Sequence, residues 1–556
     1  MSDATTPAGT SPAPAADRVR GGLTVDVTTG AADTPPTVDV PGTTGTSSGT
    51  PASGAAPAPA PGEEPTTAAE AAPSTSPVPA TPTRPRHRVV VVGGGPGGYE
   101  AALVAAQLGG EVTVVDSDGL GGSAVLTDCV PSKTLIATSE VMTQVDGSSE
   151  LGVRYAGVAS GEHVGVDLGV VNARVKQLAH AQSGDIMASL SAVGVALVPG
   201  KGRLVPGTHG SHGSPDVEVT APDGSTQVLE ADSVLLAVGA TPRRLDTAMP
   251  DGERILDWRQ LYDLDELPRR LVVVGSGVTG AEFASAYLAL GCEVVLVSSR
   301  DRVLPGEDAD AAEVLEEAFL RRGMEVLARA RAETVRREGD GVVVTLADGQ
   351  RIRGSHCLMA VGSTPNTTDL GLEDVGVQTS PSGHIAVDRV SRTSVPSVYA
   401  AGDCTGVFAL ASVAAMQGRI AMRHLLGDAV RPLSLKTVSS NIFTSPEIAT
   451  VGWTQAQIDS GEAQGVSVML PLATNPRAKM QGVSEGFVKL FARTGSGTVI
   501  GGVVVGPRAS ELIFPVTLAV EHRLSVDDVA RSFTVYPSLS GSIAEAARRL
   551  HPSPIS

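Results

Sequence analysis

The stretch VVVVGGGPGGYEAALVAAQLGGEVTVVDSDGLGGSAVLTDCVPSK spans residues Val89–Lys133 and decides the fold. It starts with the β-branched run Val89–Val92, typical of a buried parallel strand, which breaks into glycines spaced GxGxxG at Gly93, Gly95 and Gly98. In this pattern the first glycine permits a tight turn, the second admits a pyrophosphate to the backbone, and the third packs the next helix on the strand. The pyrophosphate then lies at the N-terminus of that helix.

The following residues complete a dinucleotide-binding unit. Tyr99–Leu108 is rich in alanine and predicts a helix. Val112–Val115 predicts a second strand that ends at Asp116, 23 residues after Gly93, where a carboxylate can bind the ribose hydroxyl pair. A GxGxxG alone is often only a glycine-rich turn, but strand, helix, strand and terminal acid in this order indicate dinucleotide binding.

The same pattern recurs downstream. A strand is predicted over Leu271–Val274, a helix is expected to begin at Ala281, and another strand is predicted over Val294–Val297. The glycines of this second turn, spaced as in the first, are Gly275, Gly277 and Gly280. The chain is therefore expected to bind two dinucleotides.

The second unit lacks the terminal acid. Its strand ends at Ser298, again 23 residues after the first glycine, and Ser299 and Arg300 follow. With no carboxylate to repel it, a 2′-phosphate can be accepted by the two serine hydroxyls and Arg300, so this site is predicted to accept or prefer NADPH over NADH. The alternative for Arg300 is an ordinary surface arginine, and the missing acid is the firmer observation.

Composition narrows the class of protein. The 556 residues exceed one domain, and a net charge of −18 argues against nucleic acid as the main partner. Residues 1–86 are dominated by Pro, Ala, Thr, Ser and Gly, which predicts a disordered tail that acts as a linker or, less simply, as a docking arm. No secretory signal opens the chain and no apolar run is long enough for a transmembrane segment, so we expect a cytoplasmic protein.

The four cysteines are widely scattered and form no CxxC pair, and the ten histidines are dispersed. This pattern fits reduced thiols better than a disulfide framework or a zinc site, so we predict no metal.

Six further segments carry a family resemblance. They are VLLAVGATP (234–242), LMAVGSTP (358–365), YAAGDCTG (399–406), IFTSPEIATVG (442–452), GFVKL (486–490) and YPSLSG (536–541). With the two glycine turns they resemble the flavoprotein disulfide reductases, the family of dihydrolipoamide dehydrogenase and glutathione reductase. In that family the first two segments are paired strand–turn segments that link the two nucleotide domains. The resemblance implies FAD under the first turn, with Gly239 and Asp403 near it, and NADPH or NADH under the second, with Gly362 near it.

The resemblance also implies the architecture: an α/β fold with two Rossmann-like dinucleotide-binding domains, for FAD and NAD(P), and a C-terminal α+β dimerisation domain. We place the FAD domain at 87–248, the NAD(P) domain at 249–365, a return to the FAD domain at 366–433 and the dimerisation domain at 434–556. Residues 200–230 alternate apolar and polar side chains around turns and predict an antiparallel meander. The family forms homodimers in which the C-terminal domain completes the partner's active site.

The departures from the family decide the function. Disulfide-reducing members carry GGTCxNxGCxPSK, whereas this chain reads GGSAVLTDCVPSK over 121–133, with Ala124 in place of the first cysteine. Exchange with a disulfide needs a second thiol to resolve the mixed disulfide, so Cys129 alone would stall. The family's His before Pro, and the Glu five residues later, are replaced by Tyr536 and Gly541. The first cysteine and the His–Glu pair are thus both missing, on segments far apart in the sequence, which argues against a lipoamide dehydrogenase.

The side that receives electrons is intact. In the family a lysine and a glutamate pair beside the flavin N5, and Lys133 and Glu282 match them; the alternative is two separate surface charges.

The whole pattern resembles the actinobacterial NAD(P)H quinone reductases, which implies ping-pong transfer of two electrons from NAD(P)H through FAD to a quinone. Ala124 leaves room for a flat acceptor, and Tyr536 offers an aromatic wall and a hydrogen bond to quinone, or is simply packed.

Other functions stay open. A soluble pyridine nucleotide transhydrogenase also lacks the disulfide, a peroxidase or NADH oxidase would depend on Cys129, and a redox-sensing FAD-binding subunit would have little turnover.

Cys129 has two interpretations of similar weight. At a helix start beside a flavin its pKa is expected to be lowered, giving a thiolate, or it is a small buried filler.

Overall fold

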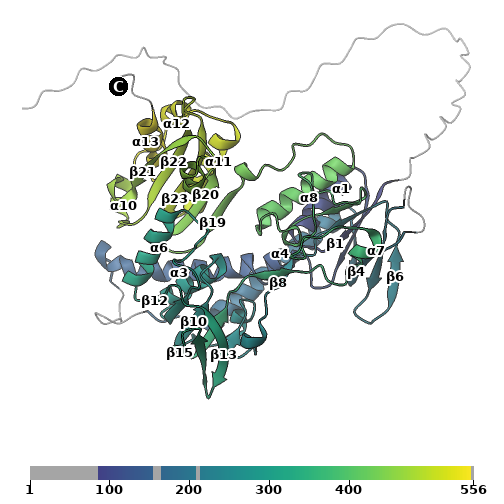
Figure 1. Cartoon of the computed structure of the whole chain (residues 1–556), viewed down its shortest axis with the longest axis horizontal. Coiled ribbons are helices and arrows are strands. Elements are labelled where there is room, and N and C mark those ends of the chain that lie inside the picture. Colours follow the sequence, from purple (N-terminus) through teal and green to yellow (C-terminus); the bar gives the residue numbers. More distant parts are fainter. Residues whose placement is uncertain (1–85, 155–163, 208–212, 552–556) are drawn as a thin grey trace, which may run out of the picture. The chain divides into compact units, whose positions relative to one another are not determined.

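The computed structural model describes residues 86–154, 164–207 and 213–551 (Figure 1). The predicted tail lies almost wholly outside the described residues. No helix within the described ranges is long and apolar enough to cross a membrane.

The first parallel sheet has the order β18-β7-β1-β2-β3. Its strands are β1 (Arg88–Val92), β2 (Glu111–Asp116), β3 (Ala196–Pro199), β7 (Ser233–Leu236) and β18 (Val398–Ala400). Val89–Val92 is buried because both faces of a parallel sheet are covered. Helix α1 (Pro96–Gln107) packs against α8 (Ala411–Leu425), so segments far apart in the sequence build this layer (Figure 1).

The second parallel sheet has the order β12-β11-β10-β16-β9. Its strands are β9 (Ile255–Leu256), β10 (Arg270–Val274), β11 (Glu293–Val297), β12 (Glu325–Leu327) and β16 (His356–Met359), with helix α5 (Val278–Ala289) after β10. Beside it lies an antiparallel sheet of β13 (Ala332–Glu338), β14 (Gly341–Leu346) and β15 (Arg351–Gly354). The two predicted βαβ units are confirmed.

Both helices begin earlier than predicted. α1 starts at Pro96 rather than Tyr99, and α5 starts at Val278 rather than Ala281. The first-turn N–H groups have no intrahelical partner, so a proline and glycines fit there at little cost, and the glycine turn itself becomes the first helical turn.

Two smaller predictions hold. The segment after β3 is an antiparallel meander of β4 (Lys201–Val205), β5 (Asp216–Thr220) and β6 (Thr226–Leu229). The segments at 234–242 and 358–365 pair with each other. Strand β8 (Ala240–Pro242) lies antiparallel to β17 (Ser363–Pro365), and the pair links the two parallel sheets.

The C-terminal part is α+β, as predicted. Its antiparallel sheet has the order β19-β20-β23-β22-β21. The strands are β19 (Ser439–Ile442), β20 (Glu447–Gly452), β21 (Gly465–Pro471), β22 (Phe487–Arg493) and β23 (Val499–Gly506), followed by helices α11 (Ala509–Glu521), α12 (Val526–Arg531) and α13 (Gly541–Leu550).

Four more helices position the site. They are α2 (Gly122–Leu126), α3 (Cys129–Gly147), α4 (Leu168–Ala192) and α6 (Ala309–Arg321). Helix α3, which begins at Cys129, contacts both α4 and α5. It therefore packs against the second dinucleotide-binding unit, to which α5 belongs.

Candidate active site

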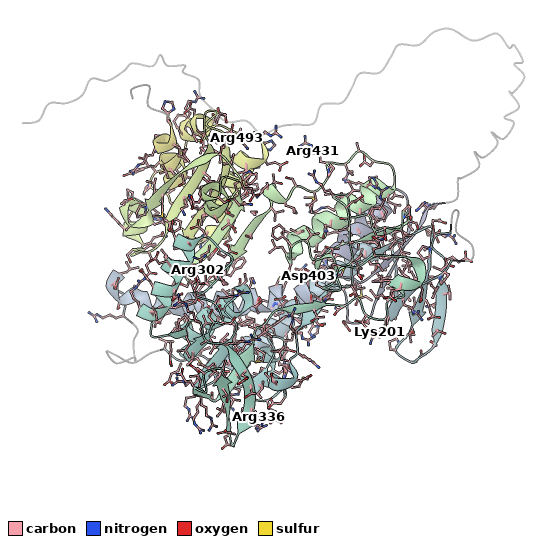
Figure 2. All side chains as sticks on the ribbon, in the orientation of Figure 1. Lys201, Arg302, Arg336, Asp403, Arg431 and Arg493 are labelled. Atoms are coloured by element: carbon pink, nitrogen blue, oxygen red, sulfur yellow. The ribbon has the colours of Figure 1, made fainter. Side chains whose placement is uncertain are left out.

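A cavity of about 1560 Å³ connects the two nucleotide units. The predicted residues that line it are Gly93, Gly95, Asp116, Cys129, Lys133, Gly239, Glu282, Gly362 and Asp403, the last labelled in Figure 2. The second turn reaches the cavity through Val278 and Thr279. The structure thus brings together residues that lie up to 310 positions apart, from Gly93 to Asp403.

The glycine turns fit a dinucleotide. A Cβ on Gly98 would lie 1.8 Å from the Gly93 carbonyl oxygen, and one on Gly280 would lie 1.9 Å from that of Gly275, so the third glycine is required by packing. A Cβ on Gly277 would meet nothing within 4 Å, and one on Gly95 would meet only Gly122 Cα at 4.0 Å. The second glycine is therefore not needed for internal packing, as expected where a pyrophosphate approaches the backbone.

Asp116 closes the first turn. Its carboxylate accepts hydrogen bonds from the backbone N–H groups of Gly94 (2.7 Å), Asp118 (2.9 Å) and Gly119 (2.6 Å). These bonds hold the carboxylate at the cavity wall, and they show that it shapes the loop in addition to the ribose contact predicted for it.

The prediction for Ser298 is wrong. Its side chain is fully buried, and its hydroxyl forms hydrogen bonds with Ser276 Oγ (2.7 Å) and with the backbone of Arg300 and Arg302. It therefore ties two turns together and is not available to a phosphate. Ser299 and Arg300 are exposed and remain candidates. Arg302, labelled in Figure 2, is half-buried two residues later.

The predicted ion pair is confirmed. Lys133 Nζ lies 2.8 Å from Glu282 Oε2, and the other oxygen of Glu282 accepts the backbone N–H of Phe443 at 2.8 Å. Lys133 also lies 5.0 Å from the centre of the Phe443 ring. Glu282 is buried, so its charge is compensated by these two partners.

Lys133 stays protonated at neutral pH. Burial works against its charge, but the charge of Glu282 and its hydrogen bond prevail and raise the pKa of Lys133 above its ordinary value. A raised lysine pKa in the folded protein means that the stabilisation is fully present below about pH 10.5 and is lost only at higher pH. The pair is therefore intact across the physiological range.

Of the two interpretations of Cys129, the thiolate is contradicted. Cys129 is the first residue of α3 and a free thiol, but burial and then the negative charge of Asp128 raise its pKa to about 12. Desolvation is the largest cause, and the carboxylates of Asp128, Glu282 and Asp403 add to it. Together they outweigh the positive charge of Lys133, which lowers the pKa of the thiol. Cys129 is half-buried and lines the large cavity, so the structure disfavours the thiolate interpretation without making the residue a fully buried filler.

Tyr536 lies apart from these groups. Its relative exposure is 83% and it does not line the cavity of its own chain. The neighbouring Phe533 and Val535 are also exposed. The prediction that Tyr536 acts on a partner's site is not tested within one chain.

Sequence reasoning missed three groups near the site: Asp128, Tyr262 and Phe443. Asp128 precedes Cys129, at a position where the family motif has glycine, and that difference was a readable signal. Phe443 lies in the family segment IFTSPEIATVG, but only the fold shows that its backbone N–H donates a hydrogen bond to Glu282. The sequence around Tyr262 contains no recognisable motif, and this residue comes close to the site only because the chain folds.

Two dinucleotide-binding units share one cavity, and a lysine–glutamate pair with a buried glutamate lies between them. This arrangement is typical of oxidoreductases that bind a flavin and a nicotinamide dinucleotide. Comparison with known families agrees. Residues 87–418 match the pyridine nucleotide-disulphide oxidoreductase family and residues 438–547 match its dimerisation domain. The chain belongs to the pyridine nucleotide-disulphide oxidoreductase family. It is an oxidoreductase whose family uses FAD and NAD(P)H.

Individual relatives refine this placement. An "NAD(P)H dehydrogenase (quinone)" of Mycobacterium tuberculosis is 56% identical over 466 residues, covering 83% of this chain and 94% of the relative. A dihydrolipoyl dehydrogenase of Geobacillus stearothermophilus is 33% identical over 471 residues, covering 84% and 96%. The crystal structure of LpdA from Mycobacterium tuberculosis superposes with a TM-score of 0.80 at 55% identity, covering 84% of this chain and all (100%) of that one.

Proposed function

We propose that this protein transfers electrons from NAD(P)H, with NADPH accepted or preferred, through FAD to a quinone by two-electron reduction without an active-site disulfide. One observation carries the proposal. The Lys133–Glu282 pair is assembled at 2.8 Å, while the thiol partner that would pass electrons to a disulfide is replaced by Ala124. The name of the 56% identical relative supports the same acceptor.

Distinct residues would hold each cofactor. Those assigned to FAD are Gly93, Gly95, Gly98, Asp116, Lys133, Gly239 and Asp403. Those assigned to NAD(P) are Gly275, Gly277, Gly280, Glu282, Ser299, Arg300 and Gly362. When bound, FAD supplies the two-electron carrier between nicotinamide and acceptor. Lys133 and Glu282 keep a compensated charge pair at this wall of the cavity, with the ring of Phe443 5.0 Å from Lys133 Nζ.

Cys129 would take no part in electron transfer. Its thiol is protonated at neutral pH, and no second cysteine of the described residues forms a disulfide with it. The acceptor must therefore reach the flavin itself, which favours a flat, two-electron acceptor over a dithiol.

The proposal includes a homodimer. The C-terminal part matches the family's dimerisation domain and exposes large apolar side chains. They include Phe514, Phe533, Val535 and Tyr536. A second copy would cover these side chains. Because the family's C-terminal domain completes the partner's active site, Tyr536 would lie there, where its ring and hydroxyl could contact a quinone.

The test is anaerobic reduction of the purified holoenzyme with NADPH, followed by menadione or, separately, by lipoamide. We expect the flavin absorbance to bleach with NADPH and to return with menadione but not with lipoamide. Rapid return with lipoamide would show that another thiol replaces Ala124 and would refute the proposal. Failure to bleach would favour a binding subunit instead.

Coenzyme choice gives a second measurement. Replacing Arg300 with alanine is expected to raise the KM for NADPH about tenfold or more, because one charge-assisted hydrogen bond to the 2′-phosphate contributes about 1.5 to 3 kcal/mol. The KM for NADH, which has no 2′-phosphate, serves as the internal control and should stay within about twofold. Equal losses with both coenzymes would assign Arg300 to the fold rather than to the phosphate.

A further inference from the structure

Asp128 occupies an unusual position. In the family motif GGTCxNxGCxPSK a glycine precedes the second cysteine, whereas this chain has Asp128 before Cys129. Asp128 is the N-cap residue of α3, yet its side chain accepts no capping hydrogen bond from the helix. An aspartate at an N-cap ordinarily binds the free N–H groups of the first turn. Here Asp128 instead belongs to the lining of the large cavity.

The surroundings favour a proton on this carboxyl group. Burial raises the pKa of Asp128 to about 6; the positive charge of Lys133 opposes this shift, and the carboxylates of Glu282 and Asp403 add to it. Cys129, which follows it, is a neutral thiol. Asp128 therefore changes protonation close to neutral pH.

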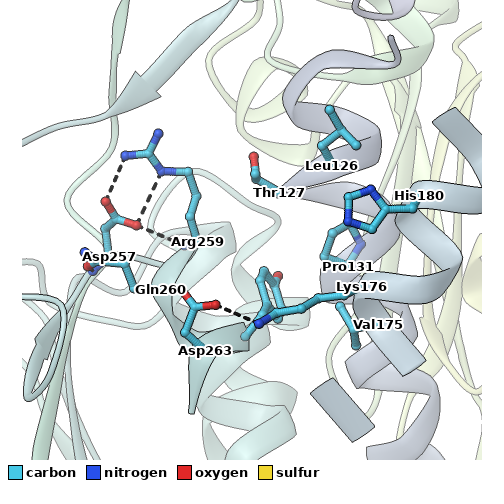
Figure 3. A pocket seen from close by; sticks show the side chains of 11 residues that line it. Leu126, Thr127, Pro131, Val175, Lys176, His180, Asp257, Arg259, Gln260 and Asp263 are labelled. Atoms are coloured by element: carbon cyan, nitrogen blue, oxygen red, sulfur yellow. Dashed lines mark hydrogen bonds and ion pairs between the residues drawn. The ribbon is translucent and has the colours of Figure 1, made fainter. Parts of the chain in front are cut away.

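A second, smaller pocket is lined by the residues just before Asp128. It has a volume of about 460 Å³ and is lined by Leu126 and Thr127, just before Asp128, and by Tyr262 from the other side. Figure 3 shows the Lys176–Asp263 ion pair, with a 2.8 Å Nζ–Oδ1 distance, spanning its lower part. Leu126 and Thr127 line the large cavity as well, so the two spaces adjoin at the loop that carries Asp128.

Tyr262 adds an independent observation. Its hydroxyl is buried and has no hydrogen-bond partner among the described residues. After burial itself, the charge of Asp128 contributes most to raising the pKa of Tyr262. A buried hydroxyl without a partner is costly, and it is suited to a water or proton that passes from the small pocket toward Asp128.

We propose that Asp128 is the acid that protonates the quinone. The inference rests on the proposed function. Reduction follows NAD(P)H + H⁺ + quinone → NAD(P)⁺ + hydroquinone. The nicotinamide supplies one hydride, which carries both electrons, and one proton must come from elsewhere. Asp128 gives that proton to a quinone oxygen, its O–H bond breaks as the hydroquinone O–H bond forms, and the resulting carboxylate takes a proton back from solvent in the small pocket.

The test uses the FAD-loaded enzyme, reduced with NADPH and mixed anaerobically with menadione between pH 5 and 9. In the wild type, the reoxidation rate should fall as the pH rises through about 6. Asp128→Asn should slow reoxidation at pH 6 at least tenfold and abolish this pH dependence, and Asp128→Glu should recover part of the rate. Asp185→Asn, on the exposed side of α4, is the matched control and should behave as wild type.

Thermal unfolding gives a readout independent of turnover. Folding raises the Asp128 pKa from 3.8 to about 6, so the folded protein binds the proton more tightly and wild type loses stability as pH rises between these values. Asparagine cannot titrate, so the Tm of Asp128→Asn should rise relative to wild type from pH 4 to pH 7. Control Asp185→Asn should show no such trend.

The outcomes separate the two claims. Wild type that menadione does not reoxidise refutes the proposed function, and the role of Asp128 with it. Wild type that is reoxidised while Asp128→Asn keeps the same rate and pH profile refutes the role of Asp128 alone. A Tm difference that does not change with pH also refutes it, because Asp128 would then not hold a proton.

Discussion

Replacing Lys133 with methionine is expected to destabilise the protein by about 3 kcal/mol and to slow flavin reduction by NADPH about 100-fold. Glu282 would remain buried, with only the N–H of Phe443 to compensate its charge. The stability loss lies at the low end of the range for broken buried pairs, because Lys133 is itself 30% exposed and Phe443 keeps one hydrogen bond. Chemical denaturation and stopped-flow absorbance measure the two effects.

A double variant separates the two effects. Lys133→Met combined with Glu282→Gln removes both charges and keeps the acceptor for Phe443, so most of the stability should return. Flavin reduction should stay slow, because the positive group is still missing. Recovery of the rate along with the stability would mean that Lys133 acts only on the fold.

Replacing Lys489 with methionine is expected to destabilise the protein by about 4 kcal/mol. Lys489 lies in β22 of the C-terminal sheet, and its Nζ is 2.9 Å from Asp308 Oδ2 and 2.6 Å from Asp310 Oδ2. The side chains of Lys489 and Asp308 are 5% and 3% exposed, so methionine leaves a buried carboxylate with only the backbone N–H groups of Asp310 and Ala311 as partners. Asp308 also caps α6, so the loss should loosen the contact between the C-terminal sheet and the second nucleotide unit.

Limited proteolysis and chemical denaturation test this contact. The matched variant is Asp310→Asn, whose carboxylate is 47% exposed and should cost less than about 1 kcal/mol. Near-equal effects of Lys489→Met and Asp310→Asn would show that burial of the Lys489–Asp308 pair does not contribute as argued.

Several site residues show where sequence reasoning stops. Strand, glycine turn and helix are local features, so both βαβ units and the pairing of β8 with β17 followed from spacing and family segments. Ser298 looked like a phosphate ligand because it ends a strand, but its burial against Ser276 depends on how two turns meet. Likewise, the helix start allowed a thiolate at Cys129 as one of two interpretations, whereas the surrounding desolvation and carboxylates keep the thiol protonated.

The sequence by itself determined the two nucleotide units, the loss of the exchanging thiol at Ala124, and the identity of the Lys133 and Glu282 partners. These properties depend on residue type and short-range spacing. Tertiary structure decided which polar groups are free to react. The carboxyl group of Asp128, the hydroxyl of Tyr262 and the N–H of Phe443 converge from separate segments, and their protonation and partners depend on burial, which arises only when distant segments pack together.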